Sequence, residues 1–455
     1  MNRKSPLDYP IDNPNIESWK DIKYLTDVNS IYIYQIGEKK YFFFGDQHFS
    51  KSKGNCQEKF NIKCDDYNEN FTNGKYYGTS CTSIGILLHN WFTYNKDFYI
   101  NTDFYLELPF INNDDERKSI EEFKSELMKL IKNKNYEPEI NIENISWMEL
   151  IGSVMSDCFK KNKNNCPYYP NVHSHYVDIR NLDTKNKNIM ADPFLLFDLL
   201  KYISKNPPRS EEKLSILKDE LSIIMSIIIY DYRKILNGML NSSGFDDFIN
   251  EYSDLARSFS SDLATFYIQK ITNMEKISVI RNNVRMHKAA AELSRLKVES
   301  PFMALLIEEL IYDKADSYID IIKEKYDNML DIFEFEYFKH NIYEKFLLIM
   351  TEFQQIIAEM VLLSSLSMDA YLLARMFLQT ESSEIIVYAG SIHIEHYMEF
   401  FEKYLAVQRL AGVDSLADNR CLNIIDLPKY LDANKYRKYV VNKKYKDYYD
   451  FQRKL

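Results

Sequence analysis

Two stretches of this chain share one pattern: YFFFGDQH at residues 41–48 and IIVYAGSIH at residues 385–393. Each is an apolar run, typical of a buried strand, that ends in Gly-x-x-His. A histidine placed just after a strand lies at the carboxyl edge of a sheet, where ligands bind in open α/β proteins. The pattern therefore predicts that His48 and His393 meet in one site, although they stand near opposite ends of the chain.

The residues around these stretches alternate between strand and helix signals. Residues 31–35 and 40–44 flank the turn residue Gly37 and predict a β-hairpin. Further patterns predict helix 84–91, strand 104–108, helix 116–132, strand 172–178, helix 191–203, strand 385–389, helix 393–405 and strand 422–426. This alternation predicts an α/β fold with a central, mostly parallel sheet flanked by helices.

Residues 206–380 differ from the rest of the chain. Two prolines followed by Ser210 predict a helix start, and apolar residues then recur at three- and four-residue spacing with almost no strand signals. We therefore expect a large all-helical insertion at 206–380. On this interpretation 1–205 and 381–430 form the two parts of the α/β core, and 431–455 is a basic aromatic tail.

Composition and charge limit the partners and the compartment. The net charge of −10 argues against a nucleic-acid-binding surface. The basic aromatic tail at 431–455 could still bind nucleic acid, but we favour the alternative that it docks on the acidic remainder of the protein. The N-terminus lacks a signal-peptide pattern, and the longest apolar run, 221–230, is shorter than the about 20 residues of a membrane span. We expect an intracellular protein without a membrane span. Its Asn-, Lys- and Ile-rich composition indicates an AT-rich genome, as in many large DNA viruses and some protist parasites. If the protein is viral, we expect it in the host cytoplasm or the virion.

The chain has six cysteines. Cys56 and Cys64 are separated by seven residues, as are Cys158 and Cys166, and this spacing is wider than that of a zinc knuckle. Reduced thiols are the favoured interpretation, with disulfides or a metal site as the alternatives.

Two further residues at strand ends complete the candidate site. Glu107 lies in an apolar strand, where a carboxylate is costly unless it is paired or binds a ligand. Two histidines and a glutamate form a known catalytic zinc set, so His48, Glu107 and His393 are candidate ligands for a divalent ion, Zn, Mn or Co. Glu107 could instead act as a general base without metal. Arg180 could bind a substrate anion or stabilise an oxyanion.

Neighbouring polar residues could support this site. His173 and His175 fall on one side of a predicted strand and could add ligands, although a solvated or core pair is favoured. His396 follows the second motif by one helical turn and could join the site. Asp46 and Gln47 could orient the histidine of the first motif.

The order of these elements resembles the Tiki/TraB superfamily, which includes erythromycin-esterase-like and ChaN-like proteins. The matching elements are Gly45 to His48, Glu107-Leu108, Arg180-Asn181 with Met190-Ala191, and Gly390 to His393. They cover about half of the chain. The chain departs from the family in two respects: Ile179 stands where the family usually has an acid, and the gap between the arginine and Met-Ala elements is longer.

The resemblance implies an α/β core with a central sheet. Tiki members are metal-dependent proteases, erythromycin-esterase members hydrolyse lactones through His and Glu, and ChaN-type members bind haem. We therefore expect a hydrolase that cleaves an ester or amide in a small-molecule or peptide substrate, with the helical insertion covering the cleft. The alternatives are a non-catalytic structural or virion-associated protein that retains the fold, and a haem- or small-ligand-binding protein.

Overall fold

In the computed structural model, the chain forms two compact units. One comprises Met1–Leu108, Asn113–Tyr176 and Glu381–Leu455, and the other comprises Pro109–Asn112 and Val177–Thr380. The residues that the structure describes are 23–26, 28–46, 81–85, 87–88, 91–92, 100–109, 148, 151–152, 169–178, 193–241, 288–335, 341–378, 382–414 and 421–424. The predicted helix at 116–132 lies outside them, as does the tail at 431–455.

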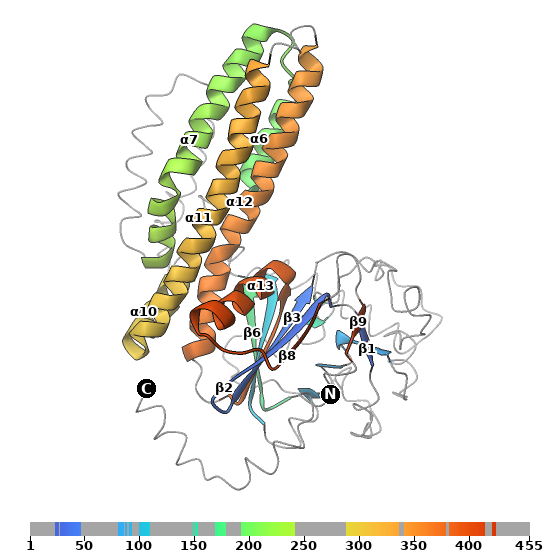
Figure 1. Cartoon of the computed structure of the whole chain (residues 1–455), viewed down its shortest axis with the longest axis vertical. Coiled ribbons are helices and arrows are strands. Elements are labelled where there is room, and N and C mark those ends of the chain that lie inside the picture. The colour runs from blue at the N-terminus through green and yellow to red at the C-terminus, as the bar shows by residue number, and fades with distance from the viewer. Residues whose placement is uncertain are drawn as a thin grey trace, which may run out of the picture. The chain divides into compact units, whose positions relative to one another are not determined.

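The first unit is built on a mixed, mostly parallel sheet of six strands in the order β6-β5-β7-β3-β2-β8. Its strands are β2 (Ser30–Ile36), β3 (Lys39–Asp46), β5 (Thr102–Pro109), β6 (Val172–Asp178), β7 (Glu384–Gly390) and β8 (Ala411–Asp414). This combination of a sheet with helices confirms the α/β class predicted from the sequence (Figure 1).

The hairpin predicted around Gly37 is confirmed as β2 and β3, which pair antiparallel. Gly37 has a φ of 60°, a left-handed conformation that glycine adopts without steric cost. β3 then pairs parallel with β7, and β7 pairs parallel with β5. The hairpin is thus joined to strands that are distant in the sequence.

Apolar side chains cover both faces of the central strands, which explains why these strands read as continuous apolar runs. Phe42 packs edge-on against Trp91, with ring centroids 4.5 Å apart, and the described residues at 84–85, 87–88 and 91–92 are helical. Phe43, which points to the opposite face, packs edge-on against Phe401 at 5.2 Å. Phe401 belongs to the π-helix η7 (Phe400–Tyr404), which continues α13 (Ser391–Glu399). The predicted helices at 84–91 and 393–405 therefore cover opposite faces of β3.

A second, three-stranded sheet lies in the same unit. β1 (Tyr24–Thr26) pairs parallel with β4 (Cys81–Ser83) and antiparallel with β9 (Cys421–Asn423). The strand predicted at 422–426 therefore belongs to this small sheet rather than to the central one. Cys421 is disulfide-bonded, so the favoured expectation of reduced thiols is wrong for this cysteine. The four cysteines with seven-residue spacing lie outside the described residues.

Apart from the last residues of β5 and β6, the second unit is helical in its described part. Its helices are α6 (Pro193–Lys205), α7 (Glu211–Asn241), α10 (Lys288–Glu299), α11 (Pro301–Glu334) and α12 (Ile342–Leu378), and they run side by side (Figure 1). The predicted helix start is confirmed: α7 follows Ser210, whose Oγ accepts a hydrogen bond from the backbone N–H of Lys213 at 3.3 Å. The apolar run at 221–230 lies inside α7 and is mostly buried.

One described helix, α12, is long and apolar enough to cross a membrane by length and composition. Its best 18-residue window has a mean hydropathy of 1.6, and 44% of that window is buried within the protein. The core helix of a soluble protein meets the same criteria, so this observation is weak evidence for a membrane span.

Candidate functional site

Both Gly-x-x-His motifs begin at the same edge of the central sheet. β3 and β7 are adjacent and parallel, and their register places Gly45 opposite Ala389 and Asp46 opposite Gly390. The two motif glycines are therefore one residue out of register. β5 flanks β7 on its other side, with Leu106 opposite Tyr388. The carboxyl ends of three parallel strands thus meet where α/β proteins commonly bind ligands.

The carboxylate of Glu107 organises the second motif. Glu107 Oε1 lies 3.2 Å from His393 Nε2, and each side chain is only 3% exposed. Glu107 Oε2 accepts a hydrogen bond from the backbone N–H of Gly390 at 2.6 Å. Gly390 is the N-cap of α13, and the positive end of a helix dipole stabilises an anion there. Glu107 therefore holds both the start of α13 and the imidazole that α13 carries.

The other two predicted catalytic residues, His48 and Arg180, lie outside the described residues. Their roles remain predictions. Asp46, two residues before His48, is buried, and its Oδ2 accepts a hydrogen bond from the Tyr388 hydroxyl at 3.4 Å. Three described residues at this edge, Asp46, Glu107 and His393, are thus polar and buried.

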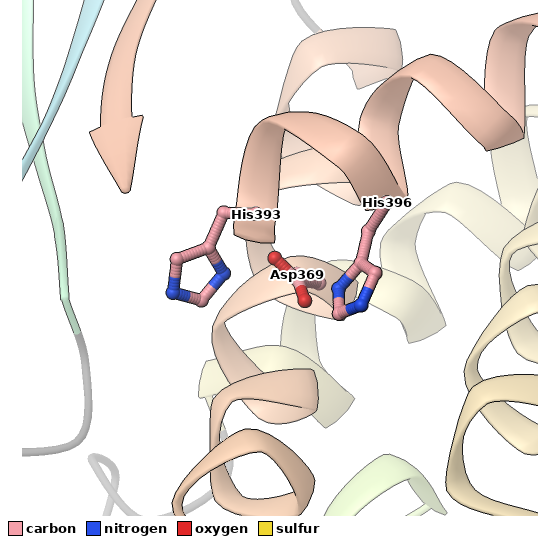
Figure 2. Close-up of side chains that lie close together, drawn as sticks. All are labelled: Asp369, His393 and His396. Atoms are coloured by element: carbon pink, nitrogen blue, oxygen red, sulfur yellow. The ribbon is translucent and has the colours of Figure 1, made fainter. Parts of the chain in front are cut away.

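Further buried side chains of the kinds that bind metal ions lie on α13 and α12. His396, which also lies on α13, is buried. Asp369 is fully buried in α12, and its side chain is labelled with those of His393 and His396 in Figure 2. Imidazole and carboxylate are common zinc ligands, so each of these side chains could serve as a ligand to a metal ion.

The reasoning that singled out Glu107 also applies to Asp369, which the sequence analysis missed. Asp369 is a lone carboxylate in the apolar segment from Leu362 to Leu378. A buried acid is costly unless it is paired or binds a ligand. The signal was weaker in α12 because helices of this length usually carry some acids on their solvated face.

A second polar cluster lies near the amino end of β5. His173 Nδ1 and His175 Nε2 lie 3.3 and 3.4 Å from the same atom, Asp103 Oδ1. Burial disfavours the charged form of Asp103, but hydrogen bonds from the two histidines hold its pKa well below the usual value. Desolvation lowers the pKa of nearby Lys39 to about 8, partly offset by the charge of Asp103. The prediction that the two histidines face the same side of the strand is confirmed.

The chain matches no protein-family model, and it has no significant match among curated proteins or solved structures.

Proposed function

We propose that this protein is a hydrolase in which His393 and Glu107 activate a water molecule for attack on an ester or amide carbonyl. One observation carries the proposal: a buried Glu–His pair lies 3.2 Å apart at the carboxyl edge of the sheet. A carboxylate that orients a histidine is the arrangement by which many hydrolases obtain a general base.

The contacts of Glu107 define a role for each ring nitrogen of His393. A neutral imidazole carries one N–H, and the hydrogen bond it makes selects the tautomer. With Nε2–H donating to Glu107 Oε1, Nδ1 is the nitrogen that accepts a proton from water. Glu107 then stabilises the imidazolium that forms. Because the Gly390 N–H holds the other carboxylate oxygen, the pair stays aligned as the charge moves.

A divalent ion, Zn, Mn or Co, is the alternative way to activate the water, because a His393 Nδ1 that binds an ion cannot also accept a proton. The set expected from the sequence is His48, Glu107 and His393, and the buried His396 on the same helix as His393 could add a ligand. When bound, such an ion lowers the pKa of a coordinated water to about 7. The protein's own part is to present imidazoles and carboxylates in a buried setting.

The resemblance to the Tiki/TraB superfamily agrees with this proposal, because those hydrolases also rely on His and Glu at strand ends. Arg180 would bind a substrate anion or the developing oxyanion. The helices between β6 and β7 in the chain would form an insertion that selects a small-molecule or peptide substrate.

The test compares the wild-type protein with His393→Asn on a panel of chromogenic esters and labelled casein. His173→Asn is the matched control, because it makes the same change in the second polar cluster. We expect His393→Asn to lower turnover by about 10²-fold or more with an unchanged circular dichroism spectrum, and the control to stay within about twofold. A wild-type protein that cleaves no substrate, or a fully active His393→Asn variant, would contradict the proposal and favour a structural role.

Metal content supplies a second readout that does not depend on turnover. If the proposed ion is bound, mass spectrometry of the purified protein should find it at about one per chain. His396→Ala should then lower that occupancy, whereas His173→Ala should leave it unchanged.

A further inference from the structure

One outward face of the helical unit is apolar, although the solvent-facing side of a helix is normally polar. Val298, near the end of α10, is 84% exposed, and Phe302 and Leu305, in the first two turns of α11, are 68% and 59% exposed. Single exposed apolar side chains are common, but a contiguous group of large ones is typical of a surface that a partner covers. We call these three residues the apolar stripe.

The apolar stripe is continuous although Ser300, between α10 and α11, has a non-helical φ of −149°. Helical hydrogen bonds continue on both sides of this residue: its N–H donates to the carbonyl oxygen of Leu296 at 2.6 Å, and its carbonyl oxygen accepts from the N–H of Ala304 at 3.1 Å. Leu293 and Leu296 are buried, and so are Ala304 and Ile307, each about three turns later. The inward and outward faces therefore keep their helical phase across the break.

Opposite charges flank the apolar stripe at equal distances from its centre. Arg295 and Glu309 are exposed, and each lies about two helical turns from Phe302 in the sequence, one before it and one after it. Arg295 pairs with Glu292 at 2.8 Å, but such a surface pair contributes little to stability, and Glu292 also binds Arg375 at 3.0 Å. Glu309 has no ion-pair partner among the described residues. Both flanking charges can therefore pair with a partner molecule.

We propose that the apolar stripe is the contact surface of a homodimer, in which the α10–α11 segments of two copies pack antiparallel about Phe302. A two-fold axis at this residue brings the same patch of both copies together. It places Val298 against the partner's Leu305, and Arg295 against the partner's Glu309, each of them twice. A parallel pair would instead place each of the two charges against its own equivalent, and like charges in contact weaken an interface. The charges therefore favour an antiparallel second copy as the partner.

The first measurement is the mass of the full chain by sedimentation velocity, from about 5 µM to about 200 µM, a range suited to a small, reversible interface. The wild-type mass should rise toward that of a dimer, and Phe302→Ser should stay monomeric. The control is Tyr230→Ser, because Tyr230 is 79% exposed on α7 outside the apolar stripe, and it should dimerise like the wild type. A wild-type protein that is monomeric throughout, or a dimer that Phe302→Ser does not weaken, would overturn the proposal.

The second measurement reverses the flanking charges. Arg295→Glu and Glu309→Arg each place like charges opposite each other at both ends of the antiparallel contact, and each should raise the dissociation constant of the dimer by about tenfold or more. The double variant restores opposite charges between the copies and should recover dimerisation. Within each copy it still places two acids together at 292 and 295, so recovery reports on the contact between copies. A double variant that dimerises as weakly as the single variants would overturn the antiparallel arrangement.

Discussion

Glu107 Oε1 lies 3.2 Å from His393 Nε2, although more than half of the chain separates the two residues. The pairing depends on β5 and β7 being neighbours in the sheet, with Phe104 opposite Ile386 and Leu106 opposite Tyr388. The site is therefore a consequence of sheet order, and changes that disturb the packing of these strands should disturb the site as well.

Gly45 is one such packing position. A Cβ there would lie 2.3 Å from Ser30 Oγ, so Gly45→Ala should destabilise the fold by about 1–3 kcal/mol. The Ser30→Ala change removes the clashing oxygen and should restore part of that loss in the double variant. Urea denaturation of the four proteins checks this. If Gly45→Ala lowered the free energy of unfolding equally in the wild-type and Ser30→Ala proteins, the contact with Ser30 Oγ would not be the cause of the loss.

Much of the central sheet could be predicted from the sequence. The hairpin has a glycine turn between apolar runs, and the strand predicted at 172–178 has the bounds of β6. β1, β4 and β8 could not be predicted, because strands of three or four residues carry almost no periodic signal and depend on distant partners. From the sequence, Glu107 and His393 could be expected only to lie at the same edge of the sheet. Their contact depends on the order of the strands, which local sequence patterns do not determine.

The cluster of Asp103, His173 and His175, of which the sequence pointed to the two histidines, leads to a prediction about how stability depends on pH. Its folded pKa lies below the ordinary value of 3.8, so the folded state binds fewer protons than the unfolded chain as the pH falls below about 4. The stabilisation is therefore complete above that pH and is lost in acid. Asp103→Asn should cost about 2 kcal/mol at pH 7, with the difference shrinking below pH 4. Urea denaturation across pH 2–7 checks this; a constant difference would contradict it.

Lys39 should have the opposite pH dependence. Burial lowers its folded pKa from 10.5 to about 8, so its charge destabilises the fold below pH 8 and this penalty disappears as the pH rises toward 10.5. Lys39→Met keeps the apolar stem and removes the charge. It should stabilise the protein at pH 7 by no more than about 3 kcal/mol, with little effect near pH 10.5. A gain that did not change with pH would point to packing instead.

The disulfide at Cys421 should be detectable chemically. Thiol titration of the denatured, unreduced protein should find fewer than the six cysteines of the chain. Because β9 pairs with β1 next to this residue, Cys421→Ser should lower stability by about 2–4 kcal/mol. Reduction of the wild-type protein should cause a similar loss. Six free thiols without reductant would contradict the disulfide.

The central claim is that Glu107 and His393 act as one catalytic unit, and a double-mutant cycle on kcat/KM tests it most directly. The proteins are the wild type, Glu107→Gln, His393→Asn and the double variant, assayed on the best substrate of the panel. Residues that act together are strongly non-additive, so the double variant should be about as impaired as His393→Asn alone. Losses that multiply in the double variant would show that the two residues act independently and would contradict the account.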